Sequence, residues 1–133
     1  MSEVSIPILK DADVVIARRA ARDLARDAGL GIADQTRLAT AVSELARNAL
    51  QHGGGGLCTL RQATENGQVV IGVELEDGGP GIEDVELAMT DGYSTGLGMG
   101  AGLPGTRRLM DDLSIDSQPG HTVICASMRR RPR

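Results

Sequence analysis

The dipeptide Asn66-Gly67 constrains the fold most strongly, because it separates two stretches that have the composition of β-strands. Residues 57–63 and 68–76 are rich in apolar and β-branched residues, and Asn-Gly is the strongest short signal for a two-residue hairpin turn. We therefore expect these two strands to be antiparallel neighbours. Pro119-Gly120 separates a second pair of expected strands, residues 113–117 and 122–128, in the same way.

Helical patterns precede both hairpins. Val4, Ile6 and Ile8 alternate as in a half-buried strand, and a first helix, with Asp11 or Asp13 as its N-cap, is expected to end near residue 29. A second helix, with Asp34 as its N-cap, is expected to stop in the glycine run 53–56, and its apolar residues recur at helical spacing.

Two shorter helices are expected later in the chain, at residues 83–89 and after Pro104. This order predicts an α+β sandwich in which helices pack on one face of a mixed, largely antiparallel sheet. The length of 133 residues fits one domain, residues 1–133.

Composition excludes several classes of function. The chain has no Trp or Phe and a net charge of -4, which argues against single-stranded nucleic-acid binding. No apolar run approaches the ~20 residues that span a bilayer. Cys58 and Cys125 are expected to be reduced thiols that pack in the interior, so we expect a soluble, cytoplasmic protein. The arginine-rich end, residues 129–133, is interpreted as a solvated tail.

Three groups of polar residues and glycines could carry chemistry. In the first, Glu44 and Asn48 lie four residues apart and share one face of the second helix. A carboxylate can accept a hydroxyl proton, and an amide oxygen is a suitable ligand for magnesium. A solvated helix face explains the same pair without any function.

The second group is Asp77, Gly79 and Gly81, which directly follows a strand pattern. Asp at a strand end could accept a hydrogen bond from the exocyclic amine of a base, and glycines let a flat ring approach the backbone. An ordinary turn has the same composition.

The third group is Gly98, Gly100 and Gly102, whose backbone N–H groups could converge on an anion beside the N-terminus of the next helix. A flexible surface loop is the other interpretation. The loop does not open a βαβ unit, and Lys10 is the only lysine, so neither a Rossmann fingerprint nor a P-loop fits. Arginines near the motifs are therefore the candidate phosphate contacts: Arg47, Arg107 and Arg108.

Taken in order, the three groups resemble the N, G1 and G2 boxes of the GHKL ATPase/kinase superfamily, whose nucleotide-binding unit is the Bergerat fold. Gly120-His121-Thr122 resembles the terminal Gly-x-Thr element of that superfamily. Ser43 to Asn48, Asp91 to Thr95 and Gly100 to Gly105 are most similar to the anti-sigma-factor serine kinases, and among them to the stressosome switch kinases.

The resemblance implies a role for each matching residue. Glu44 would be the catalytic base, Asn48 would coordinate Mg²⁺, and Asp77 would bind the adenine amine of ATP with help from Thr122. Gly79 and Gly81 would let the adenine ring approach the backbone closely. The lid over the phosphates would comprise Gly98, Gly100, Gly102 and Leu103.

The activity that this resemblance implies is phosphoryl transfer from ATP to Ser or Thr of STAS-domain proteins, followed by activation of a PP2C-type phosphatase. The alternative is a nucleotide-gated binding module that sequesters a sigma factor or activates a phosphatase with little catalysis. A generic nucleotide hydrolase is a more distant alternative. The Glu44 carboxylate favours the kinase.

Overall fold

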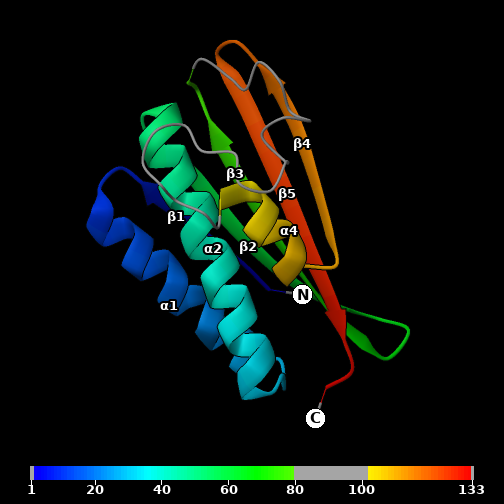
Figure 1. The fold of residues 1–133 in the computed structure, drawn as a ribbon. Helices are drawn as coiled ribbons and strands as arrows, with labels where there is room; N and C mark the ends of the chain where they lie inside the picture. Colours follow the sequence, from blue (N-terminus) through cyan, green and yellow to red (C-terminus); the bar gives the residue numbers. More distant parts are fainter. Residues whose placement is uncertain (1, 80–101, 133) are drawn as a thin grey trace.

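The computed structural model describes residues 2–79 and 102–132 (Figure 1). These residues form a five-stranded sheet with the strand order β1-β2-β3-β5-β4, in which every neighbouring pair is antiparallel. The expected α+β fold is therefore confirmed, and the part of the sheet that the structure describes has no parallel pair. The elements are β1 (Ser2–Ile8), α1 (Asp11–Asp27), α2 (Ile32–Gly53), β2 (Gly56–Glu65), β3 (Gln68–Asp77), α4 (Gly102–Leu109), β4 (Asp112–Gln118) and β5 (His121–Arg130).

Both predicted hairpins form. Asn66 and Gly67 have φ values of 53° and 78°, the left-handed conformation that a tight two-residue hairpin turn requires at both central positions. In the second hairpin the turn residue Gly120 has a φ of 85°. Strands β3 and β5 pair along almost their whole length, so the two hairpins lie side by side. The C-terminal end of β3 therefore lies next to the N-terminal end of β5.

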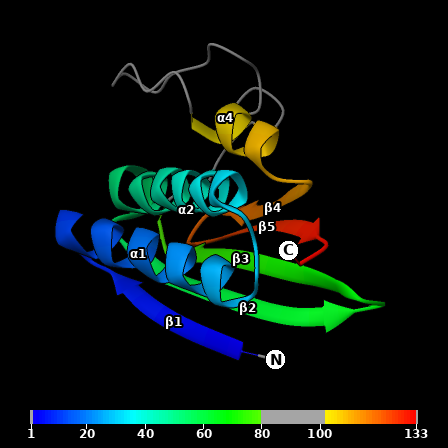
Figure 2. The ribbon, with the colours of Figure 1, turned by 90° about the horizontal axis from the view of Figure 1, so that it is seen from below.

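The helices lie on one face of the sheet (Figure 2). Alternate residues of β3 point toward them and are buried, from Val69 to Leu75, as the period of a half-buried strand requires. Helix α1 faces the core with Ala17, Ala21 and Ala25, all fully buried, and it packs against α2. The small side chains allow close approach of the helices, which compensates for a core without Phe or Trp.

The predicted helix caps were wrong in detail. Lys10, not Asp11 or Asp13, is the N-cap of α1, and the Asp13 carboxylate accepts the N–H groups of Leu9 and Lys10 at 2.9 and 3.2 Å. The N-cap of α2 is Gly31, and Asp34 lies within its first turn. Asp13 and Asp34 each lie in the first turn of a helix, where a negative charge is favourable.

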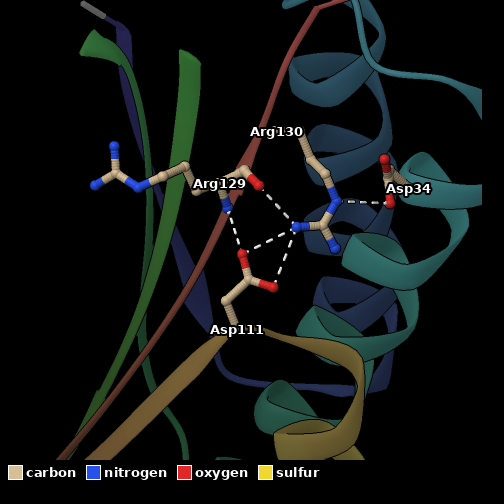
Figure 3. A network of polar contacts seen from close by, with 4 residues as sticks. All are labelled: Asp34, Asp111, Arg129 and Arg130. Atoms are coloured by element: carbon tan, nitrogen blue, oxygen red, sulfur yellow. Dashed lines mark hydrogen bonds and ion pairs between the residues drawn. The ribbon is translucent and has the colours of Figure 1, made fainter. Parts of the chain in front are cut away.

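The prediction of a solvated arginine tail was also wrong for its first two residues. Arg129 and Arg130 belong to β5. Arg130 donates through Nε to Asp34 at 3.1 Å and through Nη1 to the Asp111 Oδ2 atom at 2.9 Å, and its side chain is 26% exposed (Figure 3). It therefore links the start of α2 to the segment between α4 and β4. Arg131 is exposed, as expected of a tail.

None of the helices in the described ranges combines the length and the apolar character needed to cross a membrane.

Candidate functional site

The end of β3 packs against the C-terminus of α2, and two glycines make this contact possible. A Cβ atom on Gly53 would collide with the Asp77 side chain. A Cβ atom on Gly79 would lie 2.8 Å from the carbonyl oxygen of His52. Real Cβ atoms do not approach other atoms this closely, so any larger residue here would push β3 away from the helix. The predicted glycine run that stops α2 thus also brings Asp77 to the helix end.

Asp77 is held in place by its own backbone and by the neighbouring strand. The residue is 9% exposed, and Oδ1 accepts a hydrogen bond from the N–H of Gly79 at 2.9 Å. Thr122 is its register partner on β5 and is 2% exposed. Opposite residues on antiparallel strands have Cβ atoms roughly 5 Å apart. The two residues predicted to bind adenine therefore lie together.

The second hairpin is tied to the segment after β3. The N–H of Gly120 donates to the carbonyl oxygen of Gly79 at 2.9 Å. The hydroxyl oxygens of Thr122 and Ser117 are 2.7 Å apart, which fixes the rotamer of Thr122. Gly79 and Gly120, which are 41 positions apart in the sequence, thus belong to one rigid corner of the sheet. Sequence reasoning did not identify the contribution of Ser117.

An exposed pair lies beside this corner. His121 Nε2 is 2.6 Å from Glu76 Oε2, and the hydrogen bond to Glu76 raises the pKa of His121 above its usual value of about 6.5. The sequence predicted a strand from residue 122, and the structure begins β5 one residue earlier, at His121. The partner could not be found from the sequence, because Glu76 belongs to a different hairpin.

Glu44 and Asn48 lie on α2, on the turns before Gly53. At a rise of about 1.5 Å per residue, Asn48 lies roughly 7 Å along the axis from Gly53, and Glu44 roughly 6 Å further. The Glu44 side chain is 11% exposed, and Arg47 donates from Nη1 to its Oε1 atom at 2.9 Å. Asn48 is half-buried. One helix thus carries both predicted residues and ends against Asp77.

Helix α4 packs on α2 beside this site (Figures 1 and 2). Gly102 is its first residue, and Leu103 is 6% exposed and belongs to the core. Leu103 therefore anchors the helix that follows the glycine-rich stretch. Arg107 and Arg108 are exposed on α4. Gly81, Gly98, Gly100 and the helix expected at residues 83–89 lie outside the described residues.

The described ranges contain no group of three or more His, Cys, Asp or Glu side chains that could hold a metal ion. Cys58 and Cys125 are free thiols, and burial raises the pKa of Cys58 to about 12. Neither cysteine belongs to the site. The side chains that the site offers are one carboxylate at a strand end, one hydroxyl, one amide and one carboxylate paired with arginine.

Known proteins are similar to this chain in sequence over most of its length. Residues 9–128 match the model of the histidine kinase-like ATPase domain. The serine/threonine-protein kinase RsbT of Bacillus subtilis (strain 168) is 44% identical over 115 residues, which cover 86% of each chain. The anti-sigma F factor of Thermoanaerobacter sp. (strain X514) is 34% identical over 91 residues, which cover 64% of this chain and 62% of that protein.

Solved structures share the fold. The RsbU and RsbW domains of Rv1364c from Mycobacterium tuberculosis align over 100% of this chain with a TM-score of 0.66 and 19% identity, and the chain spans 34% of that protein. The mycobacterial sensor histidine kinase MprB aligns over 99% of this chain and 100% of that one, with a TM-score of 0.57 and 21% identity. The sequence match agrees with the order of the three motifs and with the antiparallel sheet that carries helices on one face. The chain therefore belongs to the family of histidine kinase-like ATPase domains.

Proposed function

We propose that this protein is an ATP-dependent serine/threonine kinase that works as a partner-switching regulator. The observation that carries the proposal is the contact between two parts of the site: Asp77 and Thr122 lie opposite one another, and the helix that carries Glu44 and Asn48 ends against Asp77. A purine bound at the strand end would direct its triphosphate along this helix.

The adenine site is proposed at the corner formed by β3 and β5. Asp77 Oδ1 already accepts the hydrogen bond from the Gly79 N–H, so Oδ2 would accept a hydrogen bond from the exocyclic amine. Thr122 would contribute its hydroxyl through water. Glycine at position 79, and Gly81 beyond the described residues, would let the ring lie against the backbone.

Phosphoryl transfer needs few protein groups, because positioning and charge stabilisation dominate it. The oxygen of an acceptor hydroxyl would form a bond to the γ-phosphorus, the bond from that phosphorus to the β–γ bridging oxygen would break, and ADP would leave. Glu44 would take the hydroxyl proton. Gly98, Gly100 and Gly102 would surround the phosphates, with Arg47 or Arg107 as candidate contacts.

Magnesium is the metal that suits this donor set. Mg²⁺ typically binds one or two protein oxygens and takes its other ligands from phosphates and water, so the Asn48 amide oxygen suffices. The Asn48 amide oxygen would hold the ion, whose positive charge would stabilise the phosphates during transfer. The rest of the charge stabilisation would fall to backbone N–H groups and arginine.

The acceptors that we propose are STAS-domain proteins of a stressosome or of an anti-sigma antagonist system. After its release from the phosphorylated STAS-domain protein, the kinase would activate a PP2C-type phosphatase. In an anti-sigma role it would bind a sigma factor instead. Support comes from similarity to RsbT and to anti-sigma F factors. We further propose that residues 1–133 act as one domain in the cytoplasm, without nucleic acid or membrane.

The experiment that tests this function separates binding from transfer. Transfer of radiolabelled phosphate from ATP to a STAS-domain protein is measured together with nucleotide titration. Glu44→Ala should abolish transfer and leave ATP affinity within about threefold, because the carboxylate acts on the acceptor. Undiminished transfer by this variant would remove Glu44 as the base.

One observation favours the alternative of a nucleotide-gated binding module. The Glu44 carboxylate is engaged by Arg47, so the free protein holds its proposed base in an ion pair. A protein that consumes no ATP, alone or with any partner, but binds its partner only when ATP is present would fit that alternative. Consumption of ATP only in the presence of the partner would fit the kinase.

A further inference from the structure

Three polar side chains lie in one row across the end of the sheet. Thr122 of β5 is the register partner of Asp77 on β3 and, on its other side, of Ser117 on β4. Register partners on antiparallel strands point to the same face of a sheet, so this row lies on the face that the helices cover. Thr122 is 2% exposed and Ser117 is half-buried, so their hydroxyl groups are largely removed from bulk water.

Ser117 and Thr122 are joined by a hydrogen bond between their hydroxyl groups. The two oxygens are 2.7 Å apart, the usual length of such a bond. The turn that connects β4 to β5 is tied to the segment after β3, because the N–H of Gly120 donates to the carbonyl oxygen of Gly79 at 2.9 Å. The hydroxyl pair therefore lies in a part of the sheet whose backbone is held from both sides.

The direction of this hydrogen bond decides what Thr122 offers to a bound base. A hydroxyl group has one hydrogen and two lone pairs. If Thr122 donated to Ser117, it would present only lone pairs, and it would then be a second acceptor beside the Asp77 carboxylate. If Ser117 donates to Thr122, the Thr122 hydrogen stays available, and an acceptor and a donor stand side by side.

The second direction matches one edge of adenine. Adenine presents its exocyclic amine, a donor, next to the ring nitrogen N1, an acceptor. Asp77 Oδ2 would accept from the amine, and the Thr122 hydrogen would reach N1 through a water molecule. Guanine and hypoxanthine present an acceptor and a donor in the opposite order at the same two positions. A hydroxyl that is held as a donor therefore favours adenine over both.

We infer that Ser117 is a positioning residue of the nucleotide site: its hydroxyl donates to Thr122 and thereby directs the Thr122 hydrogen toward N1 of the adenine ring. The inference rests on the proposed adenine site, and it adds a residue that lies outside the three motifs and does not touch the nucleotide. Because Ser117 acts through Thr122, its loss should affect only ligands that have an acceptor at N1.

Titration calorimetry of the full chain with ADP, 1-deaza-ADP and 7-deaza-ADP tests this role. The 1-deaza analogue has a C–H group in place of N1, and the 7-deaza analogue lacks a nitrogen on a different edge of the ring. Ser117→Ala should weaken binding of ADP and 7-deaza-ADP about threefold to tenfold, because one neutral hydrogen bond is lost, and should leave the affinity for 1-deaza-ADP unchanged. A merely structural role would weaken the binding of all three ligands alike.

Three further variants separate the hydroxyl group from the shape of the side chain. Ser117→Thr keeps the hydroxyl and should restore the wild-type affinity for ADP. Ser117→Cys is close to serine in shape but is only a weak donor, so it should behave like Ser117→Ala, and it carries the test if the alanine variant does not fold. Ser114→Ala is the matched control, because Ser114 is an exposed serine of β4 on the opposite face of the sheet.

A double-mutant cycle shows whether Ser117 acts through Thr122. In the Thr122→Val background, Ser117→Ala should cause no further loss of ADP affinity, because the hydroxyl that Ser117 positions is already absent.

The positioning role is overturned if Ser117→Ala binds ADP as tightly as the wild type, if it loses affinity equally for ADP and 1-deaza-ADP, or if it weakens binding further in the Thr122→Val background. Failure of the proposed function gives different results. A wild-type protein that binds no ADP would overturn the adenine site together with the role of Ser117. Binding of ADP without transfer to any acceptor would overturn the kinase activity alone.

Discussion

Asp77 and Thr122 are register partners on β3 and β5, although they are 45 positions apart in the sequence, and both are almost completely buried. The pairing joins the C-terminal end of β3, in the first hairpin, to the N-terminal end of β5, in the second. It places an anionic acceptor and a hydroxyl side by side at the same corner of the sheet.

We predict that Asp77→Asn weakens nucleotide binding roughly tenfold to a hundredfold, because a hydrogen bond to a charged acceptor contributes about 1.5–3 kcal/mol. Thr122→Val should weaken binding less, since it removes a neutral hydroxyl. Asp112→Asn on the exposed face of β4 is the control. Titration calorimetry with ADP measures all three. An unchanged affinity of Asp77→Asn would exclude this corner as the adenine site.

Gly53→Ala should displace Asp77, because the added methyl group would occupy the space of the Asp77 side chain. We expect a loss of about 1–3 kcal/mol in the free energy of unfolding, together with weaker nucleotide binding. Gly72→Ala is the matched control, since nothing lies within 4 Å of its added Cβ atom. That variant should be neutral or slightly more stable. Urea unfolding gives both values, and equal effects of the two variants would contradict the proposed close packing.

Arg130→Met should lower the free energy of unfolding by about 1–3 kcal/mol, because it leaves Asp34 and Asp111 without their shared cation in a partly buried position. Arg129→Met is the control. Its ion pair with Glu65 is exposed and 3.4 Å long, so its loss should cost at most about 0.5 kcal/mol. Equal midpoints in urea for the two variants would show that the network does not hold β5 to α2.

The pKa of His121 should be raised in the folded protein by its hydrogen bond to Glu76. The stabilisation from this pair is then complete below the pKa of the unfolded residue, about 6.5, and is lost as the pH rises through the folded pKa. Titration of the imidazole by NMR should show a lower pKa in Glu76→Gln than in the wild type. An identical pKa in the two proteins would show that the pair does not form in solution.

Local sequence determined the elements of this protein and the residue types of its site. The turn at Asn66 and Gly67, the alternation along β3 and the helical spacing of Glu44 and Asn48 depend on neighbouring residues only, because turn conformation and side-chain periodicity are local properties. The order of the three groups, Glu44 with Asn48 followed by the two glycine motifs, indicated the family that the sequence match confirms.

Tertiary structure decided which of these elements meet. The register of β3 against β5, the contact of Gly53 with Asp77 and the ion pairs of Arg130 join residues that are far apart in the chain. No local pattern specifies such contacts, because they depend on how the hairpins and helices pack around a common core. The arginine-rich end looked like a solvated tail for the same reason: its acidic partners, Asp34 and Asp111, come close only in the folded chain.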